Sequence, residues 1–155
     1  MSTPITTDQR SIEIFDTTLR DGLQVEGVTA TVDDKLVIAE QLDSLGVHFI
    51  EGGWPGANPK DIEFFQRAAK ELNLSTSTFV AFGSTRRPRG KVDDDPTLRN
   101  LLDAGTSTVC IVAKSWDYHV TEALQTTLEE GTAMIADSVE YLVGNDRRVL
   151  VDMEH

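Results

Sequence analysis

The chain has 155 residues, of which 39% are hydrophobic and 26% are charged, a balance typical of globular proteins rather than disordered or membrane-embedded ones. Its formal net charge of −12 comes from acidic residues scattered along the whole sequence, which argues against a nucleic-acid partner. No apolar run approaches the ~18 residues of a membrane-spanning helix, and the single cysteine excludes a disulfide framework. Residues 1–10 are polar and lack the apolar core of a signal peptide. We therefore expect a cytoplasmic protein without a membrane partner, with a flexible start over residues 1–10.

The first half of the sequence alternates strand and helix patterns. Its predicted elements are a strand at 11–15, a helix at 35–46, a strand at 47–51 and a helix that begins at Pro59. Gly46 ends the first helix, and Pro59 suits the first position of the second. The glycines and prolines of residues 52–56 predict a loop between them.

The second half continues the alternation. Its predicted elements are a strand at 76–82, a short helix from Asp95-Pro96 to Gly105, a strand at 108–113, a long helix from Thr121 to about Val143 and a strand at 148–155. Residues 108–113 form a continuous apolar run that includes Cys110, which is typical of a strand covered on both faces. Gly131 weakens the middle of the long helix. The alternation predicts right-handed βαβ units with a parallel sheet, in one domain over residues 1–155 or in part of one.

Polar side chains follow every predicted strand at the same end. They are Arg20, Asp21, Gln24, Glu51, Ser84, Arg86, His119 and Glu154. Ligands bind at this end of parallel α/β sheets and barrels. An aspartate suits a hard divalent cation, and an arginine suits a carboxylate or an enolate. The alternative is that these are ordinary solvated loop residues, with Arg20 and Asp21 forming a surface ion pair worth ~0–1 kcal/mol.

Residues 16–24, Asp-Thr-Thr-Leu-Arg-Asp-Gly-Leu-Gln, resemble the signature of the Claisen-condensing acyltransferases. This family includes the isopropylmalate, citramalate and homocitrate synthases and is related to the metal-dependent lyases that cleave hydroxymethylglutaryl-CoA. The similarity extends to residues 50–56, 82–87, 116–120 and 154–155, and the citramalate branch is the nearest. It implies an α/β fold that is part of a (β/α)8 TIM barrel, with about four βα units plus a fifth strand. A complete barrel takes ~250 residues, so we expect the amino-terminal half of a catalytic barrel.

The resemblance also implies a reaction and the roles of several residues. The reaction is the condensation of acetyl-CoA with a 2-keto acid, with pyruvate favoured, in branched-chain amino-acid biosynthesis of isoleucine or leucine. By matching position, Asp21 would bind a divalent cation (Mg2+, Mn2+ or Zn2+), and Arg20 would stabilise negative charge on the keto or enolate oxygen. Glu51 would orient Arg20 or a metal-bound water. Glu154 would line the keto-acid pocket and take part in proton transfer.

Three further residues are expected to contact the substrate or the region around the metal. Gln24 would form a hydrogen bond near the metal, Arg86 would supply positive charge for an anionic substrate, and His119 would lie at the helix-opening loop. His119 is equally consistent with a cap or a surface residue.

The sequence departs from the family pattern in its histidines. The family completes its metal site with a His-x-His pair, whereas His48, His119 and His155 are not so spaced. We therefore expect the remaining metal ligands to be absent, and synthase activity of the 155-residue chain alone to be negligible. Unpaired first and fifth strands predict a homo-oligomer. Three alternatives stay open: a 2-isopropylmalate synthase, a metal-dependent carbon–carbon lyase, and a non-catalytic anion-binding module with an open flavodoxin-like sheet.

Overall fold

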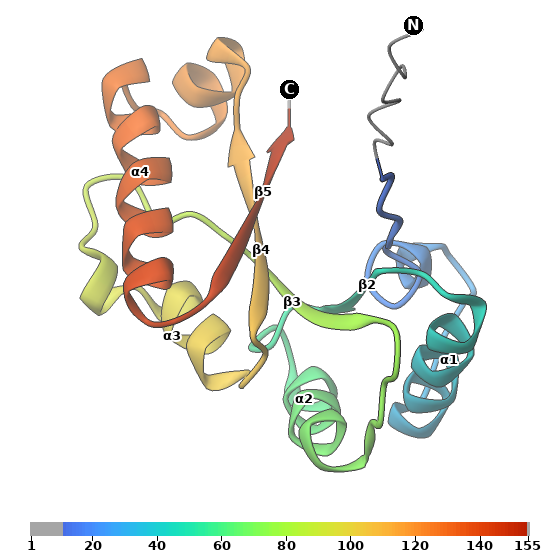
Figure 1. Ribbon diagram of the computed structural model, residues 1–155. Coiled ribbons are helices and arrows are strands. Elements are labelled where there is room, and N and C mark those ends of the chain that lie inside the picture. Colours follow the sequence, from blue (N-terminus) through green and yellow to red (C-terminus); the bar gives the residue numbers. More distant parts are fainter. Residues whose placement is uncertain (1–10, 155) are drawn as a thin grey trace, which may run out of the picture.

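The computed structural model describes residues 11–154, so the expected flexibility of residues 1–10 and the role of His155 lie outside it. Five strands form one sheet in which each strand is parallel to the next along the chain. They are β1 (Phe15–Asp16), β2 (Phe49–Gly53), β3 (Thr78–Ser84), β4 (Thr108–Lys114) and β5 (Arg148–Glu154). The strand order follows the sequence, and the sheet curls as part of a barrel does (Figure 1). The predicted partial TIM barrel is thus confirmed.

Four α-helices connect the strands within the described residues. They are α1 (Val32–Leu45), α2 (Pro59–Glu71), α3 (Pro96–Asp103) and α4 (Leu128–Gly144). They form an arc along one side of the curved sheet, with α1 and α2 beside β2 and β3, and α3 and α4 beside β4 and β5 (Figure 1). None of the described helices has both the length and the apolar character needed to cross a bilayer.

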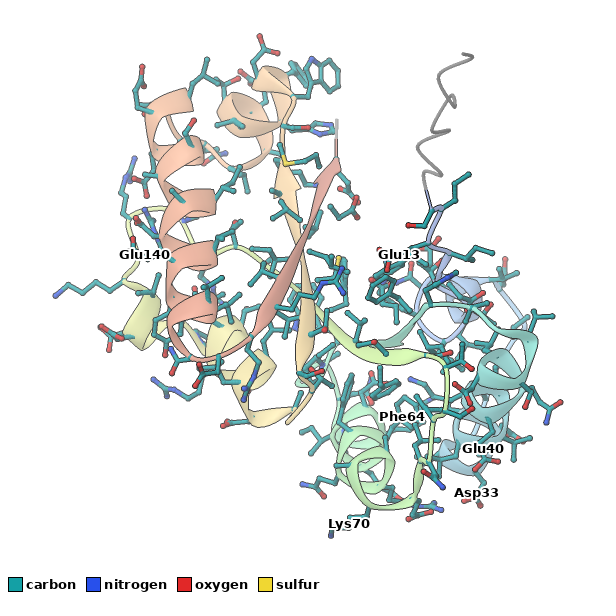
Figure 2. All side chains as sticks on the ribbon, viewed as in Figure 1. Glu13, Asp33, Glu40, Phe64, Lys70 and Glu140 are labelled. Carbon is teal, nitrogen blue, oxygen red and sulfur yellow. The ribbon has the colours of Figure 1, made fainter. Side chains whose placement is uncertain are left out.

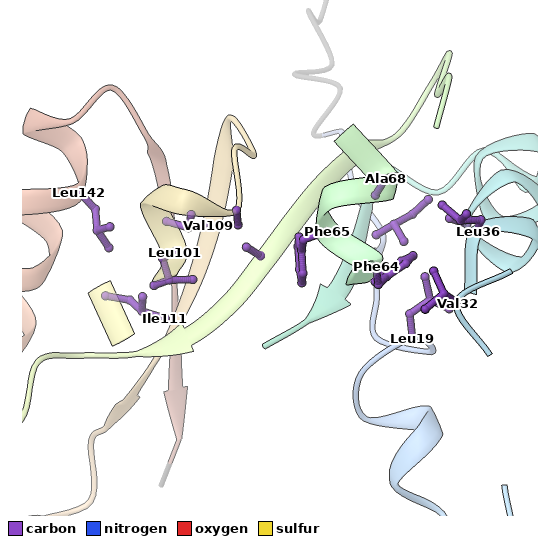
Figure 3. Packing of buried hydrophobic residues seen from close by; sticks show 14 of the residues in the cluster. Leu19, Val32, Leu36, Phe64, Phe65, Ala68, Leu101, Val109, Ile111 and Leu142 are labelled. Atoms are coloured by element: carbon purple, nitrogen blue, oxygen red, sulfur yellow. The ribbon is translucent and has the colours of Figure 1, made fainter. Parts of the chain in front are cut away.

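Apolar side chains cover both faces of the central strands. On the helix side, side chains such as Phe64, Leu101 and Leu142 fill the space between helices and sheet (Figure 3). Phe64 points inward between α1 and α2, whereas Lys70 of α2 points outward (Figure 2). The opposite, concave face carries a second cluster built from Phe49, Val80, Phe82 and Cys110. The predicted burial of Cys110 and of both faces of β4 is confirmed.

Helix α1 begins earlier than predicted because Thr31 caps it. The Thr31 hydroxyl accepts a hydrogen bond from Asp34 N at 3.1 Å, and Thr31 N donates to the Asp34 carboxylate at 2.8 Å. This reciprocal pair satisfies two backbone N–H groups at the helix start. Helix α1 therefore starts at Val32 rather than at residue 35, and Gly46, with φ of 87°, ends it as expected.

Strands β2 and β3 are displaced by two residues from the predicted ranges. The Asp43 carboxylate accepts hydrogen bonds from the backbone N–H groups of residues 75–77, at 2.7 to 2.9 Å, so β3 starts only at Thr78. Strand β2 extends through Gly52 and Gly53, which were predicted to be loop residues. Gly52 fits there because a Cβ atom at this position would lie 2.4 Å from the Phe79 ring.

The strand predicted over residues 11–15 is reduced to Phe15–Asp16. Phe15 pairs with Phe49, the first residue of β2, so the preceding residues have no strand beside them. Ile14 is still tied to this region, since its N–H donates to His48 Nδ1 at 2.9 Å. The alternation of apolar and polar side chains thus indicated β1 at the right place. The strand is shorter than predicted because β2 begins only at Phe49 and offers no partner to the residues before Phe15.

The single long helix predicted from Thr121 to Val143 is wrong. The structure has a π-helical turn at His119–Ala123 and then a separate helix, α4. Gln125, with a positive φ of 51°, breaks the helical path, and Thr127 caps α4. Gly131 lies in the first turn of α4, where a Cβ atom would be 3.0 Å from Val120. The glycine therefore allows α4 to pack closely on the preceding turn.

Candidate active site at the carboxyl ends of the strands

The loop after β1 fixes Arg20 by local hydrogen bonds and one buried anchor. The Asp16 carboxylate accepts hydrogen bonds from Thr18 N at 2.9 Å and from its hydroxyl at 3.1 Å. Arg20 N donates to Thr17 O at 3.1 Å, which closes a tight turn. Leu19 is buried in the helix-side core. The turn thus points Leu19 into the core and leaves Arg20 free to extend over the sheet.

Arg20 pairs with a carboxylate inside the protein. Its Nε donates a hydrogen bond to Glu51 Oε2, and Glu51 is only 1% exposed. The guanidinium lies 4.0 Å from the centroid of the Phe82 ring, a favourable cation–π arrangement. Trp54 packs edge-on against Phe82 at 5.9 Å between centroids. Within residues 11–154, the terminal nitrogens of Arg20 have no hydrogen-bond acceptor, and Asp21 lies 3.6 Å away. Arg20 is therefore a fixed cation with unused donors.

The environment of Glu51 raises its pKa above the ordinary value for a glutamate. Burial raises the pKa of the Glu51 carboxyl, and the negative charges of Asp152 and Asp21 act in the same direction. The hydrogen bond and positive charge of Arg20 oppose this shift in pKa. A buried carboxyl group with a displaced pKa beside a fixed cation is typical of a functional site.

A cavity of about 340 Å³ opens on the concave face beside this pair. Its lining comes from three neighbouring regions, β1, β2 and the β4–β5 pair: Phe15, Thr17, Arg20, Glu51, Cys110, Leu150, Val151 and Asp152. Asp152 was not among the residues predicted from the sequence to form the site. Asp152 precedes Glu154 by two residues, so both side chains lie on one face of β5, and this spacing is a signal that could have found it.

Glu154 lies at the end of β5, opposite Lys114 at the end of β4. Lys114 Nζ donates a hydrogen bond to the Glu154 carboxylate, which lowers the pKa of Glu154. The nearby charge of His119 lowers it further. His119 stacks edge-on with Trp116, and its buried Nδ1 has no hydrogen-bond partner among the described residues. Glu154 is therefore ionised near neutral pH, with His119 close by.

Asp21 and Gln24 lie in the loop after β1, where the described residues supply few metal-ligating groups. The Asp21 side chain is 63% exposed, and its one ion pair among the described residues is with Arg20. No group of three or more His, Cys, Asp or Glu side chains within residues 11–154 is arranged to hold a metal ion. The described residues therefore do not by themselves fit a divalent cation, and Asp21 offers one carboxylate only.

Arg86 is not brought to the other predicted site residues. Its guanidinium donates to Asp137 at 2.9 Å and to Glu130 at 2.7 Å, both on α4, and its backbone N–H donates to Ser138 Oγ at 2.9 Å. Arg86 is therefore engaged on the helix side of the sheet, away from the concave face. Its expected role as a cation for a substrate stays a prediction, and in this structure its guanidinium is paired with Asp137 and Glu130.

The sequence profile of the HMGL-like family matches residues 11–154, which is almost the whole chain. The chain belongs to the HMGL-like family. Among curated relatives of this HMGL-like chain is the (R)-citramalate synthase of Streptomyces coelicolor, 55% identical over 145 residues, which covers 94% of the chain and 27% of that synthase. The (R)-citramalate synthase of Aquifex aeolicus is also 55% identical, over 144 residues, covering 93% of the chain and 27% of that protein. The 2-isopropylmalate synthase of Pyrococcus furiosus is 37% identical over 132 residues, which covers 85% of the chain and 25% of that synthase.

Solved structures show the same fold at low sequence identity. The hydroxymethylglutaryl-CoA lyase of Pseudomonas aeruginosa superposes with a TM-score of 0.68 at 18% identity, covering 90% of the HMGL-like chain and 45% of the lyase. The HMG-CoA lyase of Bacillus subtilis gives a TM-score of 0.66 at 20% identity, again covering 90% and 45%. The HMGL-like chain thus spans about a quarter of its curated relatives and just under half of these lyases. The family resemblance drawn from residues 16–24 is confirmed.

Proposed function

We propose that this chain forms the amino-terminal part of an acyltransferase barrel that condenses acetyl-CoA with a 2-keto acid. The observation that carries the proposal is the Arg20–Glu51 pair, in which a fixed guanidinium keeps unused donors beside a cavity. The 55% identity to synthases named for (R)-citramalate supports pyruvate as the keto acid, with a role in isoleucine biosynthesis. The 37% identity to a 2-isopropylmalate synthase makes that activity, in leucine biosynthesis, the second candidate.

In this proposal, Arg20 stabilises the charge that develops during carbon–carbon bond formation. Loss of a methyl proton from acetyl-CoA gives the enolate, whose carbon attacks the keto carbon while the carbonyl electron pair moves to the oxygen, which is then protonated. Water hydrolyses the thioester of the adduct and releases the CoA thiol. The terminal N–H groups of Arg20 would donate to the keto oxygen. Because Glu51 and the Phe82 ring already hold the guanidinium in place, little reorganisation is needed when the charge appears.

Glu51 and Glu154 take different parts because their environments differ. Glu51 is buried with a raised pKa and acts as the positioning residue for Arg20. Glu154 is paired with Lys114 and has a lowered pKa, so it stays ionised and can accept a proton or a hydrogen bond from the keto-acid adduct. Gln24, which lines a cavity together with Arg20, and His119, near Glu154, are proposed to contact the substrate.

A divalent cation remains a prediction from the family resemblance. Asp21 is the one ligand that we propose from this chain, and a complete site would need further ligands from outside residues 11–154. For the same reason, we expect the 155-residue chain alone to release negligible CoA from acetyl-CoA and pyruvate. Self-association and a cytoplasmic location likewise remain predictions.

A chimeric enzyme tests the proposal directly. Residues 11–154 would replace the matching segment of the Streptomyces coelicolor synthase, and release of the CoA thiol would be followed with pyruvate or with 2-oxoisovalerate. We expect turnover with pyruvate. Arg20→Lys should reduce kcat by roughly 10²–10³-fold, as expected when one donor to an oxyanion is lost. The matched control Arg99→Lys, on the exposed side of α3, should keep the kcat of the chimera.

Two outcomes would contradict the proposal. A folded chimera that is inactive with both keto acids would show that this chain cannot supply the amino-terminal part of the synthase. Equal kcat values for the Arg20→Lys and Arg99→Lys variants would remove Arg20 from the chemistry. Turnover confined to 2-oxoisovalerate would favour the 2-isopropylmalate synthase activity instead.

A further inference from the structure

A second cavity, of about 430 Å³, lies between the loop after β1 and the start of α2. It shares Arg20 with the smaller cavity on the concave face. Its polar lining consists of Arg20, Gln24, Lys35, Asn58, Lys60 and Asp61. The family resemblance and the proposed chemistry use Arg20 and Gln24 of this lining, but not Lys35, Asn58, Lys60 or Asp61.

The two cavities have opposite charge. The 430 Å³ cavity is lined by three basic side chains, Arg20, Lys35 and Lys60, and by a single acidic one, Asp61. The 340 Å³ cavity has two acidic side chains and Arg20. Of the basic side chains around the 430 Å³ cavity, Arg20 pairs with Glu51 and Lys35 with Asp61, so Lys60 is the one without a carboxylate partner among the described residues. Coulomb attraction therefore favours an anion in the larger cavity and disfavours it in the smaller one.

Lys35 is the decisive residue because its ammonium is buried with few partners. Lys35 is 3% exposed, and its Nζ lies 4.2 Å from the centroid of the Phe64 ring. Among the described residues, its one hydrogen-bond acceptor is Asp61 Oδ1 at 3.2 Å, longer than the ~2.7–2.9 Å usual for charged pairs. An ammonium has three N–H donors. Burial lowers the pKa of Lys35, consistent with a cation that lacks acceptors.

The backbone leaves space in front of this ammonium. Gly53 ends β2 with a φ of 127°, and a Cβ atom at that position would lie 3.5 Å from Lys35 Nζ. Lys60 lies at the rim, where its Nζ donates to Ala30 O at 3.2 Å. The terminal nitrogens of Arg20 form no hydrogen bond within residues 11–154, and one of them makes an ion pair with Asp21 Oδ1 at 3.6 Å. Three cations with unused donors thus line one space that an oxygen-bearing anion can enter.

We propose that this cavity binds a small oxyanion, a carboxylate or phosphate group, through Lys35, Lys60 and the terminal nitrogens of Arg20. The anion would fill the remaining donors of Lys35 and offset the cost of burying its charge. Asp61 competes with the anion for Lys35. The site does not depend on the acyltransferase activity, because binding requires only residues of this chain.

Titration calorimetry on the 155-residue chain at low salt tests the site, with inorganic phosphate, pyruvate and CoA as separate probes. Lys60→Met should weaken binding at least ~10-fold, since one charge–anion contact is lost. Asp61→Asn should tighten binding several-fold because Lys35 loses its competing carboxylate. Lys70→Met is the matched control and should leave affinity unchanged, since Lys70 points to solvent near the end of α2 (Figure 2). Lys35→Met should abolish binding, and the Lys60→Met variant, at an exposed position, keeps the test valid if the Lys35→Met variant does not fold.

The probes distinguish the source of the oxyanion. Binding of pyruvate assigns a carboxylate, binding of inorganic phosphate assigns a phosphate, and binding of CoA alone assigns a phosphate carried by a larger ligand. Each supports the site only if Lys60→Met weakens and Asp61→Asn tightens the same complex. Absence of binding by all three probes, or equal affinities in the Lys60→Met and Lys70→Met variants, would overturn it. None of these readings involves turnover, so they are independent of the chimera assay.

Discussion

Arg20 and Arg86 follow the first and third strands, and both pair with acidic side chains, but they lie on opposite faces of the sheet. Arg86 is surrounded on the helix side by two carboxylates of α4 and by the Arg87 carbonyl oxygen, so its donors are occupied. Arg20 on the concave face has one carboxylate, Glu51, and rests on the Phe82 ring. The sequence pattern gives both residues the same apparent role, and the structure separates them.

Arg20 and Arg86 also differ in how deeply their carboxylate partners are buried. Glu51 is almost fully buried, whereas the side chains of Glu130 and Asp137 are 26% and 48% exposed. A buried carboxylate depends on its arginine for compensation of charge, while a partly exposed one can be hydrated instead. An arginine with occupied donors links elements of the fold, and one with free donors can serve a ligand. Removing each arginine in turn sharpens this contrast.

The largest expected effect is that of Arg20→Met at neutral pH. We expect the free energy of unfolding to fall by about 3 kcal/mol, because the substitution leaves Glu51 buried without a counter-charge. The pKa of Glu51 is already raised by burial, and losing Arg20 raises it further. When the pKa of Glu51 is higher in the folded than in the unfolded chain (~4.3), ionising this carboxyl costs the folded state free energy. That cost is absent at pH values below the unfolded pKa and reaches its full size once the pH exceeds the folded-state pKa. The loss should therefore be small at pH 4 and grow toward pH 7.5, as measured by urea unfolding.

The double variant Arg20→Met/Glu51→Gln is the control for this mechanism. It replaces the buried carboxylate by a neutral amide of similar shape, so it should be more stable than Arg20→Met alone at pH 7.5. Equal stability of the single and double variants, with no dependence on pH, would show that Glu51 does not carry the cost.

Arg86→Met should have a smaller and less pH-dependent effect. We expect a loss of about 2 kcal/mol in the free energy of unfolding, because the freed carboxylates of Glu130 and Asp137 can reach water. The same urea titrations at pH 5 and 7.5 measure it. A loss that exceeds that of Arg20→Met, and that grows as steeply with pH, would break the proposed contrast between the two faces.

The order of helices and strands could be predicted from the sequence, but contacts between side chains far apart in the sequence could not. Alternating patterns predicted parallel βα units with polar residues such as Arg20, Glu51 and Glu154 at one end of the sheet, and the family resemblance supplied the barrel-type strand order. Local apolar spacing could not show that Gln125 adopts a positive φ and divides the predicted helix. It also could not show that Arg86 meets side chains 44 and 51 residues later. Such contacts depend on how α4 packs against the sheet.

Residues on one strand face were partly predictable. Asp152 shares the concave face with Glu154 through the two-residue period of a strand, so its place beside Glu51 follows from the register once the sheet is known. The closeness of Lys35 to Gly53 had no such signal, since it joins α1 to the end of β2. The two-residue period of a strand and the register of its pairing predict which residues lie close together on neighbouring strands. Contacts between a helix and a strand can be known only from the three-dimensional packing.

The smallest expected effect is a change in the rate at which the Cys110 thiol is modified. This thiol lies on the concave face, so its reaction rate reports on the charges there. Burial raises the pKa of Cys110 to about 12, and the negative charges of Glu51 and Asp152 add to the shift. At pH 8 the thiolate fraction is then ~10⁻⁴, so a disulfide reagent should modify the native chain far more slowly than the chain in urea. Glu51→Gln should speed the native reaction about two- to fivefold by removing one negative charge. Glu130→Gln, on the helix side, should leave the rate unchanged; equal acceleration by both variants would show that the two faces do not differ in their effect on this thiol.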